Sequence, residues 1–467
     1  MPNYTSSILS VLIAPSAATP KITPILLLDP DAMEAHLASL NSIERAQLAS
    51  QQFTVKPGSQ AMLLNADGQL ESMLCVFAGS PLYALAKLSA SLAPGDYQLV
   101  QSDSDLTALA LGFALGSYQF TRYKPKAQIT TARLVITDPK TLARAQALTH
   151  AVASARDWVN TPTEDLGPEH LSQLAQKIAQ KYSGSFSEVV GDSLLDARFP
   201  AIHAVGRASH RDPRLIELSF GSAEDPLVVL VGKGVCFDTG GLDMKASDGM
   251  ALMKKDMGGA AVALALTELI LQTGLKIRLK LLLPAVENAI GPNAYRPGEV
   301  IATRAGISVE IGNTDAEGRV VLGDSLVYAC ESAPELLMDF ATLTGAARIA
   351  LGPDLPALFC NNEKLAADYL RAGEQTTDRL WRMPLWRPYL SYLKSNIADL
   401  ANAGPSKMAG CISAALYLER FVREGTVWSH VDVYSWNDGE RPGRPAGGEA
   451  QGLRAVFQML KTRYPKS

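Results

Sequence analysis

The chain has little of what builds disulfide frameworks or histidine-rich metal sites. Its 467 residues include five cysteines without CxxC spacing and six histidines without an HExxH or HxH pair. The odd number and wide scatter of the cysteines argue against a disulfide framework and for a reducing compartment. We therefore expect a cytoplasmic protein.

Long hydrophobic runs and an excess of positive charge are also absent. No apolar run approaches the 18 residues that a membrane helix needs, and the apolar patch at residues 8–15 is short and lacks the basic start of a signal peptide. The net charge of −4 gives no overall electrostatic reason to bind nucleic acid. These absences argue against a membrane partner and against a nucleic-acid partner.

Two common catalytic motifs are missing as well. The sequence has no GxSxG elbow to anchor a Ser-His-Asp triad. The glycines around Lys233 do not form a phosphate-binding P-loop, because Leu227 stands where that motif has its first glycine and Gly234 where it has Ser or Thr. The sequence therefore argues against a serine hydrolase of this kind and against a P-loop protein.

The sequence does contain enough apolar material for more than one domain. Apolar residues make up 47% and charged residues 19%, an ordinary globular composition, and a chain of this length suits two or three domains. We predict a smaller N-terminal α/β domain at residues 1–135, a linking helix at 136–160 and a larger α/β domain at 161–467.

Strand-like and helix-like segments alternate along the chain. Strands are predicted at residues 22–29, 61–66, 132–138, 226–234, 276–285, 308–313, 336–345 and 427–433, and helices at 81–92, 105–120, 141–160, 256–273, 320–332 and 451–464. The continuous apolar run at 226–234 is typical of a strand buried on both faces. Alternation of this kind predicts a central, mostly parallel sheet flanked by helices, with sites at the carboxyl ends of its strands.

Four carboxylates stand beside glycines, near the ends of predicted strands or the start of a predicted helix: Asp238, Asp256, Asp315 and Glu317. Taken singly, each has an ordinary explanation as a helix cap or a solvated turn. Gathered at one edge of a sheet, they would repel one another unless cations neutralised them. Two divalent metals sharing bridging carboxylates would do so, and oxygen ligands suit Zn²⁺, Mn²⁺ or Mg²⁺.

Two lysines accompany these carboxylates. Lys233 follows the predicted buried strand, and Lys245 comes a few residues after Asp238. A charged lysine beside a metal site can polarise a substrate carbonyl, whereas a lysine that loses its proton to a metal can itself be a ligand. Most lysines are surface residues, and the residues alone leave these roles open.

Several motifs together resemble one family. They are VGKGVCFDTGG (231–241) with Lys245 beyond it, MKKDMGGAA (253–261) and NTDAEGR (313–319), supported by ARDWVNTPTEDLGPEHL (155–171), NAYRPGEV (293–300), DFATLTGA (339–346) and LKSNIADLANAG (393–404). In this order they closely resemble the leucyl aminopeptidases, or cytosol aminopeptidases, a family of dinuclear metallopeptidases. The resemblance covers about residues 150–435 and makes the larger domain the catalytic one.

The resemblance implies a metal ligand for each carboxylate. Asp238 and Glu317 would bridge two divalent metals, Zn²⁺ or Mn²⁺, with Mg²⁺ as a further candidate. Lys233, as a neutral amine, and Asp256 would complete the tighter site. Asp315 would complete the readily exchanged site, partly through its backbone carbonyl.

The resemblance also implies a reaction. Lys245 would act as electrophile on the scissile carbonyl, and Arg319 would hold a bicarbonate ion that serves as general base. The free α-amine of a peptide would bind a metal, so that only the N-terminal residue is released. Gly318 would let the turn fit between the metal ligands and the arginine.

The resemblance suggests where the substrate lies and how the protein assembles. The candidate substrate-binding residues are Met253, Asn313, Ala316, Thr342, Leu343 and Gly345. An apolar pocket around Met253 would favour Leu or Met, since burying such a side chain gains about 1.5–3 kcal/mol. The family forms homohexamers, dimers of trimers, and we expect the same here. Residues 441–457 lack the family's usual Ala-Thr-Gly triplet, and residues 404–410 lack its usual Gly-Gly-Arg, which puts the side-chain preference in question.

Two other functions remain as alternatives. A DNA-binding regulatory role of the same hexamer would rest on the short basic clusters at 121–126 and 207–214. A dinuclear phosphatase would share the metal logic, but such sites rely on His and Asp ligands, which argues against it.

Overall fold

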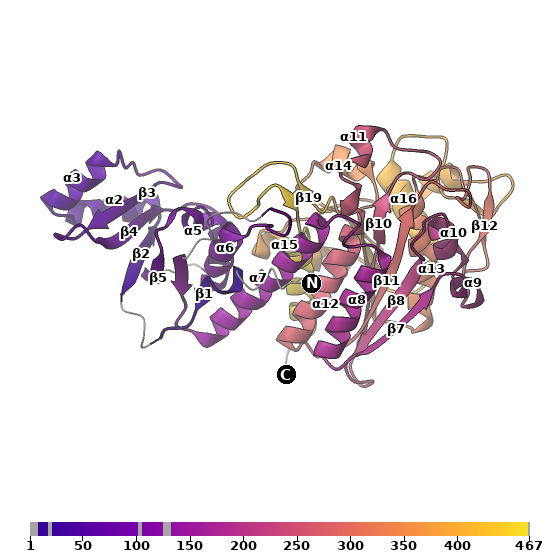
Figure 1. Ribbon diagram of the computed structural model, residues 1–467, viewed down its shortest axis with the longest axis horizontal. Helices are drawn as coiled ribbons and strands as arrows, with labels where there is room; N and C mark the ends of the chain where they lie inside the picture. Colours follow the sequence, from indigo (N-terminus) through magenta and orange to yellow (C-terminus); the bar gives the residue numbers. More distant parts are fainter. Residues whose placement is uncertain (1–7, 17–20, 101–104, 125–131, 466–467) are drawn as a thin grey trace. The chain divides into compact units, whose positions relative to one another are not determined.

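The computed structural model describes residues 8–16, 21–100, 105–124 and 132–465 (Figure 1). The chain divides into two compact units, of which the first comprises Met1–Ala153 and Gly439–Ala446 and the second Ser154–Asp438 and Gly447–Ser467. The chain passes from the first unit to the second within α7 (Pro139–Asn160), where a helix was predicted. Gly439–Ala446 also belongs to the first unit, so the first unit is not one consecutive stretch of the chain as predicted.

The first unit contains a six-stranded sheet in the order β1-β6-β5-β2-β4-β3. Its strands are β1 (Leu12–Ile13), β2 (Ile22–Leu28), β3 (Gln60–Leu64), β4 (Leu70–Val76), β5 (Gly95–Val100) and β6 (Ala132–Val135). Neighbouring strands run parallel except β3, which is antiparallel to β4. The apolar patch that begins at Ile8 packs into the core of this unit with β2 and β6.

The helix predicted at 81–92 is interrupted in the structure. Two short helices, α4 (Pro81–Ala84) and α5 (Leu88–Ser91), take its place beside α6 (Leu106–Ser117). A Cβ atom at Gly112 of α6 would lie 1.7 Å from the carbonyl oxygen of Leu82, and one at Gly116 would lie 1.9 Å from that of Ala86. The glycines of α6 thus let the backbone of residues 82–86 approach closely, which a sequence pattern for one continuous helix does not reveal.

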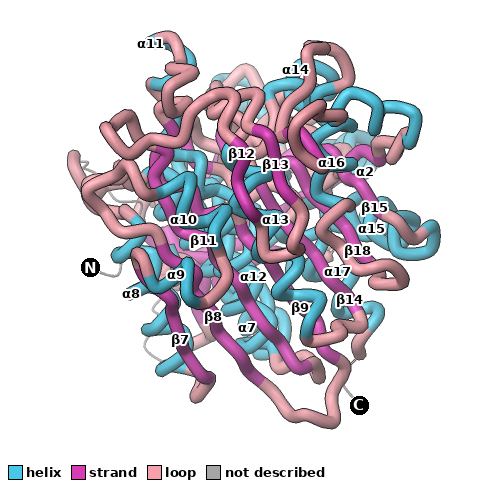
Figure 2. Tube along the Cα trace, turned by 90° about the vertical axis from the view of Figure 1, so that its right-hand side faces the viewer, coloured by secondary structure: helices cyan, strands magenta, loops and turns pink. Residues whose placement is uncertain are grey.

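The second unit contains a nine-stranded sheet in the order β16-β15-β18-β14-β9-β11-β8-β7, with β10 paired to β11 (Figure 2). Its strands are β7 (Ser185–Val190), β8 (Arg214–Phe220), β9 (Leu227–Gly232), β10 (Gly234–Asp238), β11 (Arg278–Asn288), β14 (Leu336–Ala341), β15 (Ala357–Cys360), β16 (Trp381–Arg382) and β18 (Trp428–Asp432). The four central strands β18, β14, β9 and β11 are parallel. Antiparallel pairs β15–β18, β11–β8 and β8–β7 extend the sheet on both sides.

Helices cover both faces of this sheet. Figure 1 shows α8 (Pro168–Lys181) and α12 (Gly258–Thr273) on one side, and α10 (Pro200–Gly206) and α13 (Glu317–Glu331) on the other. Val229 and Val231 of β9 pack with Val320 and Val321 of α13 in one core cluster, and every residue of β9 is buried. The predicted architecture, two α/β domains with parallel strands flanked by helices, is confirmed. None of the described helices combines the length and hydropathy that a membrane crossing requires.

Candidate metal centre

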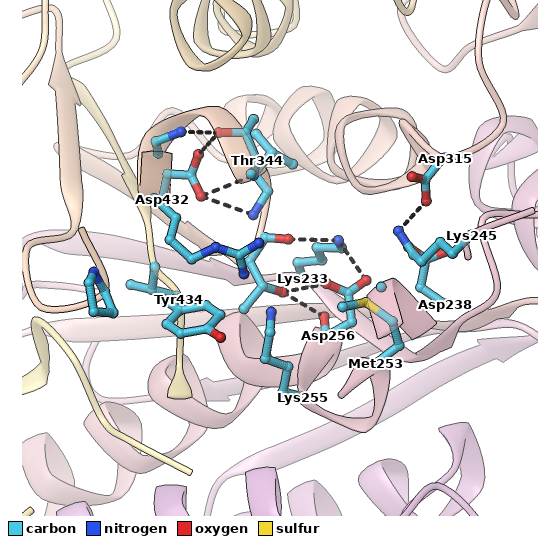
Figure 3. Close-up of a pocket in the computed structure, with 18 of the residues that line it drawn as sticks. Lys233, Asp238, Lys245, Met253, Lys255, Asp256, Asp315, Thr344, Asp432 and Tyr434 are labelled. Carbon is cyan, nitrogen blue, oxygen red and sulfur yellow. Dashed lines mark hydrogen bonds and ion pairs between the residues drawn. The ribbon is translucent and has the colours of Figure 1, made fainter. Parts of the chain in front are cut away.

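The predicted site lies where the parallel strands end. Lys233 follows β9 directly, Asp238 is the last residue of β10, Thr342 follows β14, and Asp432 ends β18. The carboxyl ends of parallel strands meet at one edge of a sheet, so residues more than 190 positions apart share one cavity. Figure 3 shows this cavity, whose volume is about 410 Å³.

The starts of two helices bring the remaining candidate ligands to the same place. Asp256 lies in the 3₁₀ helix η1 (Met253–Met257), just before α12. Glu317 is the first residue of α13, which therefore begins three residues earlier than predicted. Its carboxylate lies at the positive end of the helix dipole, which stabilises negative charge there.

Lys233 forms two buried ion pairs. Its Nζ lies 2.7 Å from Asp256 Oδ2 and 2.8 Å from Glu317 Oε1, and it donates a hydrogen bond of 2.9 Å to the carbonyl oxygen of Thr342. Burial alone would lower the pKa of Lys233, but the negative charges of Asp256, Glu317 and Asp238 raise it well above its usual value. In this arrangement the lysine carries a proton that a metal would have to displace.

Lys245 forms the second pair of contacts. Its Nζ lies 2.8 Å from Asp238 Oδ2 and also pairs with Asp315 Oδ1. Burial opposes the charge of Lys245, but Asp238, Glu317 and Asp315 raise its pKa well above the usual value. Burial and the charge of Asp238 in turn raise the pKa values of Asp315 and Glu317.

Neutral groups hold the carboxylates in place. Asp238 Oδ1 accepts hydrogen bonds of 2.8 Å from Asn288 Nδ2 and from the backbone N–H of Gly240. Thr342 Oγ1 donates a hydrogen bond of 2.8 Å to Asp256 Oδ1. These contacts fix Oδ1 of Asp238 and of Asp256, and Oδ2 of each faces a cation, here the ammonium of a lysine.

Gly318 is required by close packing rather than by an unusual backbone angle. A Cβ atom at this position would lie 2.6 Å from Lys233 Cε and 2.8 Å from Lys233 Nζ. The glycine therefore lets the first turn of α13 pass directly beside the lysine.

Arg319 lies behind the turn and is buried. Its Nη1 donates a hydrogen bond of 2.8 Å to the carbonyl oxygen of Asn402, while its buried Nε has no hydrogen-bond acceptor among the described residues. Burial lowers the pKa of Arg319. Asn402 was not predicted to matter, yet its side chain also bonds the backbone of Gly312 and Asn313 and so shapes the turn.

The predicted substrate residues fall into two groups. Four line the cavity: Met253, Thr342, Leu343 and Gly345. Asn313 and Ala316 are not among its lining residues. Asn313 instead accepts a hydrogen bond of 2.7 Å from the backbone N–H of Asp315 through its side-chain oxygen, so it shapes the turn that carries the ligand.

The cavity also contains residues that sequence reasoning missed. Lys255, Arg348 and Tyr434 lie along its wall, and Gln451 lies in the segment that lacks the usual triplet. Burial lowers the pKa of Lys255 to about 8. The motif MKKDM was singled out for Asp256. Nothing in its pattern distinguishes Lys255 from Lys254, although only Lys255 lines the cavity.

The ligand set suits divalent metals. One oxygen from each of Asp238, Asp315 and Glu317 lies within 4.8 Å of the others, and Asp256 reaches the same lysine as Glu317. Four carboxylates crowded together are stable only beside compensating positive charge, here provided by two lysines. Oxygen-rich donors of this kind fit Mn²⁺, Zn²⁺ or Mg²⁺.

Comparison with known proteins identifies the family. Residues 153–457 match the catalytic domain of the cytosol aminopeptidase family, and residues 23–137 match the M17 aminopeptidase N-terminal domain. A crystal structure of cytosol aminopeptidase from Coxiella burnetii is 43% identical with a TM-score of 0.93, covering 97% of this chain and 100% of that one. The bottromycin maturation enzyme BotP, in complex with Mn, is 31% identical with a TM-score of 0.85, covering 95% of this chain and 100% of that one.

A protein described as a probable cytosol aminopeptidase of Geotalea uraniireducens (strain Rf4) is 39% identical over 372 residues, which are 76% of this chain and 75% of that protein. The two family matches cover parts of both units, and the catalytic-domain match includes every residue of the candidate metal centre. The chain therefore belongs to the cytosol aminopeptidase family and is a metal-dependent aminopeptidase, a hydrolase.

Proposed function

We propose that this aminopeptidase uses two divalent metal ions held by Lys233, Asp238, Asp256, Asp315 and Glu317. The observation that carries the proposal is the convergence of four carboxylates and two lysines on one cavity at the strand ends. When bound, the metals would polarise the scissile carbonyl and activate water for its attack. Mn²⁺ is supported by the Mn complex of BotP, and Zn²⁺ and Mg²⁺ by the donor set.

Asp315 suits the more readily exchanged of the two metal sites. Its side chain is 31% exposed, whereas that of Asp256 is 4% exposed. A ligand that water can reach lets a metal leave and enter more easily than one enclosed by protein.

Lys245 would stabilise the charge that develops on the substrate. Nearby carboxylates keep its ammonium protonated, and a positive group at the cavity wall favours an oxyanion more than a neutral carbonyl. Arg319 would hold bicarbonate, whose role is to accept a proton. The buried Nε of Arg319, which finds no acceptor in the described part of the chain, supports that assignment because a buried donor requires an acceptor.

Met253 and Leu343 give the cavity apolar contacts that suit a leucine-sized side chain at the N-terminus of a peptide. The proposed enzyme releases such residues from peptides. It acts in the cytoplasm and assembles as a homohexamer. The location follows the relatives named cytosol aminopeptidases, and the hexamer rests on the resemblance. Light scattering of the purified protein measures the assembly directly.

The basic cluster at 207–214 gives little support to a DNA-binding role. Arg207 pairs with Glu299, Arg211 with Glu164 and Glu287, and Arg214 with Glu188. Carboxylates thus neutralise the charge that phosphates would need. Of the cluster at 121–126, residues 125 and 126 lie outside the described residues.

Hydrolysis of a leucine chromogenic amide tests the proposed function. The purified protein is assayed, treated with a chelator, and assayed again after Mn²⁺ or Zn²⁺ is added back. We expect activity to vanish and return. If the protein, with metals shown to be bound, hydrolysed none of a full panel of amides with different N-terminal residues, the proposal would be overturned.

A further inference from the structure

A third lysine in the cavity forms no ion pair with a carboxylate of the described residues. Lys255 is only 5% exposed and lines the cavity wall. Its ammonium lies over the ring of Tyr434, with Nζ 5.0 Å from the ring centroid, and no carboxylate oxygen of the described residues lies within ion-pair distance. Lys233 and Lys245, by contrast, each pair with two carboxylates.

The charges around Lys255 are of both signs, with Asp256 and Asp432 negative and Lys233 and Arg348 positive. Arg348 stacks on the same tyrosine ring, with its Cζ 4.5 Å from the centroid, and also lines the cavity. Asp432 lines the cavity too, but its oxygens accept hydrogen bonds from the backbone of Leu343 and from Thr344. Burying an ammonium without an ion-pair partner costs free energy. A negatively charged group of a substrate would therefore be stabilised beside Lys255.

Lys255 lies at the Asp256 end of the cavity. Figure 3 shows its ammonium between Tyr434 and Asp256, whereas Asp315 and Lys245 lie at the opposite end of the cavity. If the α-amine and the scissile carbonyl lie at the metal ligands, as the proposed function requires, the side chain of the N-terminal residue can extend past Met253 towards Lys255.

We propose that Lys255 is a specificity-determining residue that binds the side-chain carboxylate of an N-terminal acidic residue, and that glutamate is the preferred one. The methylene groups of glutamate contact the apolar wall at Met253 and Leu343, and its carboxylate reaches the ammonium. Leucine has a similar size, but it would displace water from Lys255 without providing an acceptor. This inference rests on the proposed function and adds acidic N-terminal residues to the leucine-sized ones proposed there.

The test compares kcat/KM for the 4-nitroanilides of Glu, Gln, Leu and Met in the metal-loaded enzyme. Wild type should prefer Glu to the isosteric Gln by about tenfold or more, the range of one charge-assisted hydrogen bond. Lys255→Met should lower the Glu-to-Leu ratio by about tenfold or more for the same reason. Lys254→Met is the matched control, because Lys254 is the adjacent lysine of η1 and donates to the carbonyl of Asn160 instead of lining the cavity.

Each outcome decides something. Equal rates for Glu and Gln in wild type, or a ratio that changes equally in both variants, would overturn the inference while metal-restored leucine activity upheld the proposed function. Because the Glu and Gln comparison uses wild type alone, it remains decisive even if Lys255→Met fails to fold. The substrate carboxylate could also be the C-terminus of a dipeptide. If Lys255→Met impaired Leu-Gly but not Leu-Gly amide or the Glu anilide, the side-chain assignment would be wrong.

Discussion

Replacing Gly318 with alanine tests whether the first turn of α13 must pass directly beside Lys233. The added Cβ would lie 2.6 Å from Lys233 Cε and 2.8 Å from Nζ, whereas non-bonded carbons prefer about 3.5–4.0 Å. Relief of the clash therefore requires a shift of about 1 Å. Lys233 has no free direction, because its Nζ is held at 2.7, 2.8 and 2.9 Å by three acceptors.

Two opposing contributions determine the effect of Gly318→Ala on stability and metal affinity. Alanine in place of glycine within a helix would by itself stabilise the protein by about 0.8–1 kcal/mol. Overpacking a well-packed site costs about 1–3 kcal/mol, and contacts of Lys233 lengthened by about 1 Å are no longer hydrogen bonds. We expect the clash to prevail and Mn²⁺ affinity to fall by about tenfold or more, which corresponds to roughly 1.4 kcal/mol.

Calorimetric titration with Mn²⁺, together with peptidase assays, measures this loss. The control is Gly249→Ala, also at the cavity, where the nearest atom to the new Cβ is Lys245 Cβ at an ordinary contact distance of 3.8 Å. Wild-type Mn²⁺ affinity in Gly318→Ala would refute the close-approach argument. Equal losses in both variants would show that any alanine at the cavity perturbs it.

Two further substitutions have expected outcomes. Glu317→Gln keeps the shape of the side chain but leaves Lys233 with one carboxylate partner; activity should fall by more than the roughly 10–100-fold that loss of a group supporting a metal ligand costs, with the circular dichroism spectrum unchanged. Burial raises the pKa of Asp324 to about 7 from 3.8, although the backbone N–H groups of Ala201 and Arg304 donate to it. A raised carboxyl pKa means that its stabilising contribution is present below about pH 4 and is lost as the pH rises through about 7, so Asp324→Asn should gain melting temperature relative to wild type between pH 5 and pH 8. A constant difference between the two melting curves would contradict that assignment.

The central parallel strands of the large sheet, and the candidate site at their ends, could be predicted from the sequence more fully than the outer strands. Strands β9, β14 and β18 are continuously buried, so their apolar runs identify them. The edge strand β7 reads SFSEVV and is largely solvent-exposed, and nothing in that composition distinguishes it from a loop. Strands β4, β5 and β8 were missed as well, and each depends on a partner that the local sequence does not reveal.

The same limit applies to the site. The candidate metal ligands could be proposed because they lie in recognisable motifs at the ends of strands and the starts of helices. The roles of Asn402 and Gln451 depend on contacts across the fold, such as Gln451 Oε1 accepting the backbone N–H groups of Tyr434 and Ser435. Whether Lys255 or Lys254 faces the cavity depends on how η1 turns before α12. The spacing of residues in MKKDM does not specify this turn.

The protonated state of Lys233 makes metal binding dependent on pH in a predictable direction. Its ammonium now pairs with Asp256 and Glu317, two of the proposed ligands, so a metal that binds its nitrogen must displace a proton. Metal affinity should therefore rise with pH, by about tenfold per pH unit for each proton displaced. Titrations in buffers with different ionisation enthalpies count the protons released, and Lys233→Met should release one fewer than wild type at the same pH. If both proteins released the same number of protons, Lys233 would not be a ligand, and its place between the two carboxylates would be that of a fixed positive charge.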